Sequence, residues 1–177
     1  VLEICVRLQQ EGICSSYLHS LSIGDTIDAF IKPNLSFRPA LGRAPIILVG
    51  AGTGIAPLIG FIRHNKAHRC IHLYWGGRRP DSDFLYESEL NSFLKDKRLT
   101  KLNAAFSRID ERAYVQDKIA NNSDEIRQLI NQGGQILVCG GRSMATSVTE
   151  KLDKVMAPLN MNVKKLKLLG RYREDVY

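Results

Sequence analysis

A short apolar run leads at once into a glycine-rich turn and a second apolar segment, IILVGAGTGIAPLIGFI, over residues 46–62. The continuous run 46–50 is typical of a parallel strand buried on both faces. Residues 54–65 indicate a helix with Pro57 in its first turn, where a missing N–H costs little. Gly50, Gly52 and Gly54 let the backbone approach a ligand, and a helix start favours an anion such as a pyrophosphate.

This glycine loop does not match a standard fingerprint by itself. Ile55 takes the place of the third glycine of GxGxxG, and no GK[ST] follows. A tight strand-to-helix turn without a ligand is the alternative interpretation.

Strand and helix patterns alternate through the rest of the chain and predict one domain. The order indicates an α/β fold, a doubly wound and mainly parallel five-stranded sheet. Further strands are predicted at 70–76, 99–107 and 135–141, with the tail as an edge strand. Helices are predicted at 82–96 (capped by Ser82 or Asp83), at 114–132 (broken near Asn121 and Asn122), at 143–159 and at 162–170.

Residues before Pro45 have a different character. Strands are predicted at 1–8 and 24–33, a short helix at 12–21, and a linker rich in Pro, Gly and Arg at 34–45. The chain starts without Met inside a strand pattern, so we expect a C-terminal piece of a longer protein. The predicted division is 1–45 and 46–177.

Charge and cysteine content narrow the function classes only in part. The net charge of +7 suits nucleic acid, a membrane surface, phosphorylated ligands or an acidic protein, but the basic residues are scattered and no nucleic-acid motif is present. The four cysteines lie far apart, which disfavours a metal or disulfide framework and fits a reducing compartment. No apolar run approaches the length of a membrane span.

Two strand ends carry groups suited to a phosphorylated ribose. Arg78 and Arg79 stand where an NAD-binding fold would carry a carboxylate for the ribose 2′-hydroxyl. Five more candidates follow the third strand, and Arg among them offers a fork of donors to phosphate. They are Ser107, Arg108, Arg112, Tyr114 and Gln116. A surface turn whose arginines pair with Asp110 or Glu111 explains this stretch equally well.

Several stretches together resemble the C-terminal part of the ferredoxin-NADP reductase superfamily. The likeness is strongest to diflavin reductases of the sulfite reductase flavoprotein type. The matching stretches, in chain order, are GICSSYL, FRP, GAGTGIAP, SDFLYESEL, AFSR, YVQDKI, VCGG and RYREDVY.

The resemblance implies an NADPH-dependent flavoprotein reductase that uses NADP(H) and FAD. Residues 1–45 would end an antiparallel FAD-binding β-barrel, and 46–177 would bind NADP(H). FMN would lie on an upstream domain or on a flavodoxin-like partner, from which electrons pass to a haem or iron–sulfur acceptor. The resemblance further implies a cytoplasmic location, or the cytoplasmic face of a membrane if an upstream anchor exists.

The resemblance also implies a role for each site residue. The FAD pyrophosphate would bind at Gly12, Ile13, Cys14 and Ser15, and that of NADPH at Gly52, Thr53 and Gly54. Ser107, Arg108, Arg112, Tyr114 and Gln116 would bind the 2′-phosphate and adenine. Cys139 and Gly140 would approach the nicotinamide with Asp175 nearby, and Tyr177 would stack on the flavin.

Two of the roles at the nicotinamide end have a plainer alternative. Cys139 has the character of a small buried residue at a strand end, and Asp175 can pair with Arg171 or Arg173. For the whole chain, a non-catalytic nucleotide-binding regulatory module is the alternative function. A charge-driven nucleic-acid binder is a third hypothesis, which we disfavour.

Overall fold

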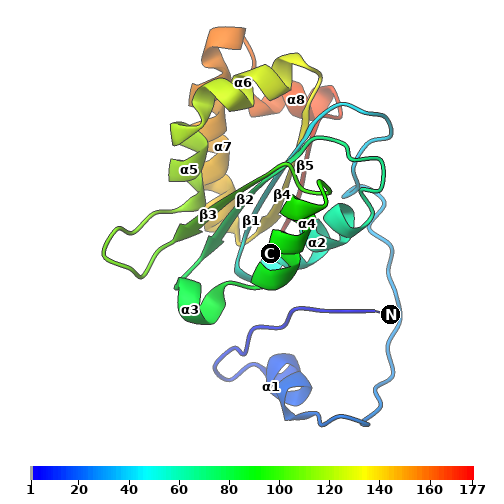
Figure 1. The fold of residues 1–177 in the computed structure, drawn as a ribbon. Coiled ribbons are helices and arrows are strands. Elements are labelled where there is room, and N and C mark those ends of the chain that lie inside the picture. Colours follow the sequence, from blue (N-terminus) through cyan, green and yellow to red (C-terminus); the bar gives the residue numbers. More distant parts are fainter. Residues whose placement is uncertain (1) are drawn as a thin grey trace.

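A parallel β-sheet forms the centre of this protein. The structure, a computed structural model, describes residues 2–177. Five strands lie in the order β3-β2-β1-β4-β5, and every neighbouring pair is parallel (Figure 1). The strands are β1 (Ile46–Ala51), β2 (Ile71–Gly77), β3 (Lys101–Phe106), β4 (Gln135–Gly140) and β5 (Tyr172–Val176). The predicted parallel α/β fold and the edge strand at the tail are confirmed.

Helices cover both faces of the sheet. On one face pack α5 (Val115–Asn121), α6 (Ser123–Asn131), α7 (Arg142–Met156) and α8 (Val163–Leu168). On the other pack α2 (Ile55–Arg63) and α4 (Glu87–Lys95). Ile47 and Val49 of β1 face the first layer, whereas Ile46 and Leu48 face the second. This double burial explains why β1 is apolar at every position.

The sheet reverses its winding next to β1. That strand pairs with β2 on one side and with β4 on the other. The connections that leave the carboxyl ends of β1 and β4 therefore run to opposite faces, α2 on one and α7 on the other. Open α/β sheets bind ligands in the crevice that forms at this point.

The prediction of one helix at 82–96, capped by Ser82 or Asp83, is wrong in the extent of the helix and in its cap. The segment forms two helices, α3 (Pro80–Asp83) and α4, and Tyr86 between them has a left-handed φ of 60°. Phe84 lies in the break, stacked on Trp75 with ring centroids 5.3 Å apart and edge-on to Phe106. Burying this ring beside Trp75 stabilises the break at the expense of a continuous helix.

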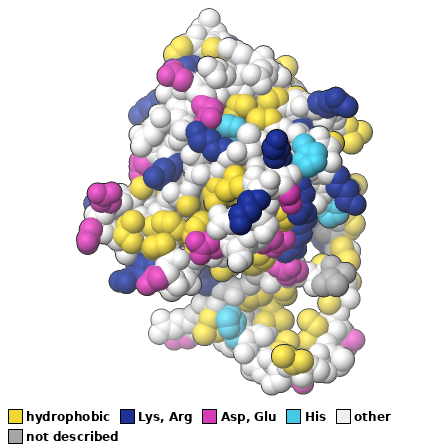
Figure 2. Space-filling model, viewed as in Figure 1, with side chains coloured by type: hydrophobic (Ala, Val, Ile, Leu, Met, Phe, Trp, Pro, Cys, Tyr) yellow, Lys and Arg dark blue, Asp and Glu magenta, His cyan; other side chains and the backbone are white. Residues whose placement is uncertain are grey.

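The strands predicted at 1–8 and 24–33 are not formed in the described residues, and Val1 lies outside them. A strand needs a neighbour to pair its backbone groups, and neither segment has one here. The predicted helix is present as α1 (Ile13–Ser20). Figure 2 shows apolar side chains on the lower part of the surface, where Figure 1 places α1 and the segments that flank it. The large apolar side chains exposed within residues 2–33 are Leu2, Ile4, Leu8, Ile13, Tyr17, Ile23, Ile27, Phe30 and Ile31.

The linker at 34–45 has no helix or strand, as predicted, yet it is held firmly. Arg69 donates to the carbonyl oxygens of Ala40 (2.7 Å) and Ala44. Arg173 of β5 donates to that of Arg38 at 2.9 Å. Phe37 is buried in the core with α2. The linker is therefore held against the sheet and α2.

None of the helices within residues 2–177 combines the length and the apolarity needed to cross a membrane.

Candidate functional site

A cleft of about 580 Å³ opens at the carboxyl ends of the central strands. Its walls come from the ends of β1, β2 and β3, from the first turns of α5 and α7, and from the N-terminal segment. The lining residues are Val6, Arg7, Ala51, Gly52, Thr53, Gly76, Gly77, Arg78, Asp83, Leu85, Ser107, Ala113, Tyr114, Val115, Gln116, Ser143, Met144 and Ser147. The cleft thus lies where the sheet topology favours a ligand.

The glycine loop forms one turn, Gly52–Gly54, between β1 and α2. Gly52 has φ +53°, and a Cβ there would meet nothing within 4 Å, so its backbone is open to the cleft. Gly54 serves a different need, because a Cβ there would lie 2.2 Å from the carbonyl oxygen of Cys139. The indole of Trp75 donates to the carbonyl of Gly52 at 3.2 Å and holds the turn in place.

The ends of β2 and β3 bring polar candidates together. Ser107, Tyr114 and Gln116 line the cleft with Arg78, whereas the exposed Arg108 and Arg112 do not. Ser107 donates its hydroxyl to the carbonyl of Gly77 at 3.3 Å. The N–H of Arg108 donates to the carbonyl of Arg78 at 2.8 Å, which fixes Arg108 beside the cleft.

The arginines at this end keep their donors free of carboxylates. In the described part of the chain, neither Asp110 nor Glu111 forms an ion pair with Arg108 or Arg112, and Arg78 has no such pair either. A guanidinium without a carboxylate retains its fork of donors for an anion.

Cys139 lies at the end of β4, next to Asp175 of β5 in the parallel register. The thiol is 4% exposed, and burial, with a smaller effect of the Asp175 charge, raises its pKa to about 12. The neutral thiol is therefore a poor nucleophile. Asp175 is exposed and has no ion pair among residues 2–177, because Arg171 and Arg173 donate to backbone carbonyls instead.

Neither Cys139 nor Asp175 lines the cleft. Asp175 borders a second hollow between the linker and α2. Gly140 follows Cys139 at φ +149°, and a Cβ there would meet Met144 Cε at 2.6 Å. Gly140 thus lets β4 pass close to the first turn of α7, at the edge of the cleft.

Tyr177 is tied to the glycine loop. Its hydroxyl lies 2.9 Å from the Thr53 hydroxyl. Its N–H donates to the Gly140 carbonyl at 3.2 Å, and its carbonyl accepts from Arg142 at 3.1 Å. The ring is 64% exposed. The last residue therefore has a fixed backbone and leaves a ring face open.

The candidates Gly12, Ile13, Cys14 and Ser15 lie elsewhere. They form the start of α1, where the Ser15 hydroxyl donates to the Gly12 carbonyl at 3.2 Å and accepts from the N–H of Gln9. Figure 1 shows α1 apart from the sheet and from the C-terminus. The structure does not bring these residues to the cleft.

Sequence reasoning missed two walls of the cleft. Ser143, Met144 and Ser147 line it from α7, and their place after a parallel strand is the signal that predicts this edge. Val6 and Arg7 line it from the N-terminal segment. No local pattern marks those two, since their position depends on long-range contacts.

Comparison with protein families gives a match over most of the sheet. The family model described as the oxidoreductase NAD-binding domain matches residues 48–150, which run from β1 into α7. The matched range includes the glycine loop and every candidate at the ends of β2 and β3.

Curated relatives match nearly the whole chain. NADPH oxidoreductase A of Dictyostelium discoideum is 40% identical over 96% of this chain and 29% of its own length. The sulfite reductase (NADPH) flavoprotein alpha-component of Buchnera aphidicola subsp. Schizaphis graminum is 39% identical over 94% and 30%. The human NADPH–cytochrome P450 reductase is 36% identical over 85% and 25%. The chain therefore spans less than a third of each of these relatives.

Proposed function

Because the chain belongs to the oxidoreductase NAD-binding domain family, within the diflavin branch of the ferredoxin-NADP reductases, we propose that it binds NADPH and presents it for hydride transfer to FAD. One observation carries this proposal: the open backbone of Gly52 and the side chain of Arg78, which forms no ion pair within residues 2–177, line a single cleft. The relatives, which are named as NADPH-dependent oxidoreductases and reductases, support the same assignment.

The cleft fits a dinucleotide that carries an extra phosphate. Backbone at Gly52 and the hydroxyl of Thr53 suit the diphosphate. Arg78 and Arg108, with the hydroxyl of Ser107, suit the 2′-phosphate of the adenine ribose. The end of β2 carries Arg78 and Arg79 where an NAD site would carry a carboxylate, which favours NADP(H) over NAD(H).

The residues near the nicotinamide would position rather than react. When bound, NADPH supplies the hydride and FAD accepts it. The buried, neutral thiol of Cys139 directly precedes Gly140, at the edge of the cleft. Asp175 offers a carboxylate that can stabilise the positive charge of the oxidised nicotinamide. Tyr177 offers an exposed ring of a kind that stacks on a flavin.

The finer assignments complete the proposal. Residues 1–45 would belong to the FAD-binding part, with the start of α1 facing the FAD pyrophosphate. Electrons would pass to FMN on a flavodoxin-like domain or partner, in the cytoplasm or at its membrane face. The net charge of +7 supports docking to an acidic partner.

Anaerobic mixing of the FAD-loaded protein with NADPH tests this proposal. We expect the oxidised flavin absorbance to bleach with NADPH and to bleach far more slowly with NADH. Tight binding of NADP⁺ without bleaching would support the non-catalytic nucleotide-binding module instead.

A further inference from the structure

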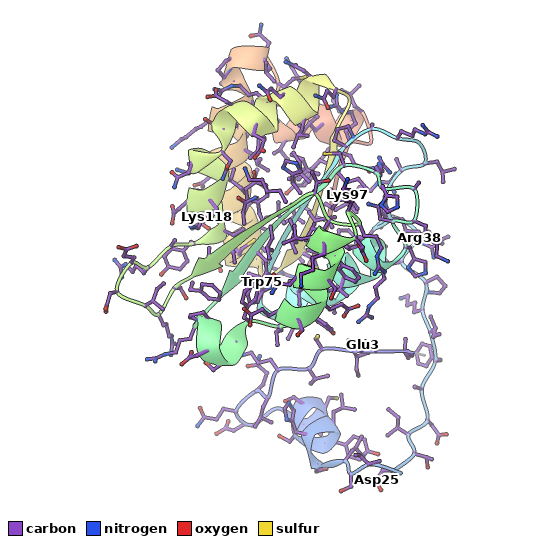
Figure 3. The ribbon with its side chains drawn as sticks, in the orientation of Figure 1. Glu3, Asp25, Arg38, Trp75, Lys97 and Lys118 are labelled. Carbon is purple, nitrogen blue, oxygen red and sulfur yellow. The ribbon has the colours of Figure 1, made fainter. Side chains whose placement is uncertain are left out.

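The N-terminal segment forms a wall of the cleft, although it belongs to no strand or helix. Val6 and Arg7 line the cleft together with Gly52 and Thr53 of the glycine loop. Figure 3 shows Glu3 on the extended segment that passes below α4. The side chain of Arg7 is exposed, and no ion pair holds it within residues 2–177.

Several polar contacts fix this segment to the sheet domain. Arg63 of α2 donates to Glu3 at 3.0 Å and to Glu89 of α4 at 2.7 and 2.8 Å. The Tyr86 hydroxyl donates to the other Glu3 oxygen and lies 3.1 Å from Cys5 Sγ. Single exposed pairs contribute little stability, but this shared network fixes where the following residues lie.

The same contacts hold the segment that carries Arg7 against the cleft, which Arg7 lines together with Gly52 and Thr53. Asp83 and Leu85 line the cleft on either side of Phe84, and Leu85 precedes the anchor Tyr86. Phe84 stacks on Trp75, whose indole holds the Gly52 carbonyl. A continuous chain of packed groups therefore runs from the anchored segment to the glycine loop.

Three charged residues line the cleft. Arg78 lies beside Ser107, where the 2′-phosphate is proposed to bind. Arg7 and Asp83 are the other charged lining residues. We propose that Arg7 binds the diphosphate of the dinucleotide held at the glycine loop, so that the N-terminal segment completes the NADP(H) site. This inference rests on the proposed function.

Ligands that carry either the diphosphate or the 2′-phosphate distinguish the role of Arg7 from that of Arg78 and Arg108. Calorimetric titrations would use NADP⁺, ADP and 2′-AMP with the wild type and with Arg7→Gln. Losing one charge-assisted contact should weaken NADP⁺ and ADP by the same factor, about tenfold. The affinity for 2′-AMP, which has no diphosphate, should stay at the wild-type value.

Lys164→Gln is the charge-matched control, because Lys164 is exposed on α8 and does not line the cleft. This control should leave all three affinities unchanged. An equal loss of affinity in both variants would mean that Arg7 acts only through the general charge of the protein, and this result would overturn the inference. Wild-type affinity of Arg7→Gln for NADP⁺ would also overturn it, as would a loss for 2′-AMP equal to that for ADP. If the wild type bound no NADP⁺ at all, the proposed function itself would fail.

Discussion

The hydroxyls of Thr53 and Tyr177 lie 2.9 Å apart, although the two residues are 124 positions apart in the chain. This hydrogen bond joins the glycine loop to the end of β5. Thr53 is the side chain proposed to contact the dinucleotide phosphates, and Tyr177 carries the ring proposed to stack on flavin. Ligand binding at Thr53 and the position of the Tyr177 ring are therefore coupled.

Tyr177→Phe tests this coupling, since it removes the hydroxyl and keeps the ring. Freeing the Thr53 hydroxyl for phosphate should tighten NADP⁺ binding by about threefold, the scale of a neutral hydrogen bond. Calorimetry measures the change. Tyr17→Phe, on the exposed α1, is the control and should have no effect. Unchanged or weaker NADP⁺ binding by Tyr177→Phe would show that the two hydroxyls do not compete with ligand.

Removing the ring of Tyr177 should relax the choice between cofactors. Both Tyr177→Ala and the chain shortened by Tyr177 lose a surface that competes with nicotinamide for the flavin face. Stacking of this kind contributes roughly 1–3 kcal/mol, so the ratio of kcat/KM for NADPH over NADH should fall about tenfold or more. Steady-state kinetics of the FAD-loaded protein give this ratio. If this ratio stays unchanged, the Tyr177 ring does not compete with nicotinamide for the flavin.

The 2′-phosphate clamp predicts a selective loss. Arg108→Ala or Arg78→Ala removes a charge-assisted contact of roughly 1.5–3 kcal/mol, which is about 10- to 100-fold in affinity for NADPH. NADH lacks the 2′-phosphate and should lose little. Fluorescence titration with each nucleotide makes the comparison, and Lys164→Ala on α8 is the control. Equal losses for NADPH and NADH would refute the clamp.

Two glycines of the same region should respond oppositely to alanine. Gly54→Ala places a Cβ against the backbone of Cys139, which cannot move aside as a flexible side chain would. We expect about 3 kcal/mol loss in the free energy of unfolding. Gly60→Ala, in α2 with nothing within 4 Å, should gain about 0.5–1 kcal/mol. Urea unfolding of both variants tests this, and a neutral Gly54→Ala would contradict the close approach.

The buried thiol of Cys139 predicts a loss of stability at alkaline pH. Burial raises its pKa from 9.0 to about 12, so above pH 9 the unfolded thiol loses its proton while the folded one keeps it. Deprotonation then favours the unfolded chain, with a slope of at most about 1.4 kcal/mol per pH unit. Above pH 10 the buried Tyr74 and Tyr172, whose pKa burial also raises, add to the slope.

Urea unfolding at pH 9 and at pH 10 isolates the contribution of this thiol. The wild type should lose more free energy of unfolding over this interval than Cys139→Ala. Equal losses would mean that the thiol titrates normally in the folded protein.

Much of the sheet domain follows from local pattern. The fully apolar run of β1 and the break at Asn121 and Asn122 each have a local physical cause, and both appear where predicted. The segments before Pro45 failed as strands because pairing depends on a neighbour and not on their own alternation. The prediction of one continuous helix at 82–96 failed at Phe84, because an aromatic contact between distant rings overrides helix propensity.

The candidate site was predictable where topology dictates it. Ser107, Tyr114 and Gln116 follow a parallel strand, and they share one cleft with Gly52. The place of Arg7 was not predictable, because it depends on the distant anchors Arg63 and Tyr86. Residues placed by side-chain contacts between remote segments leave no periodic trace in a sequence.

The most direct test of the account is the affinity of the wild-type protein for 2′,5′-ADP compared with 5′-AMP, measured by calorimetry. The two ligands differ only in the 2′-phosphate that Arg78, Arg108 and Ser107 are proposed to bind. The account predicts that 2′,5′-ADP binds about 100-fold more tightly or better, as expected for two charge-assisted contacts. Equal affinities for the two ligands would contradict it.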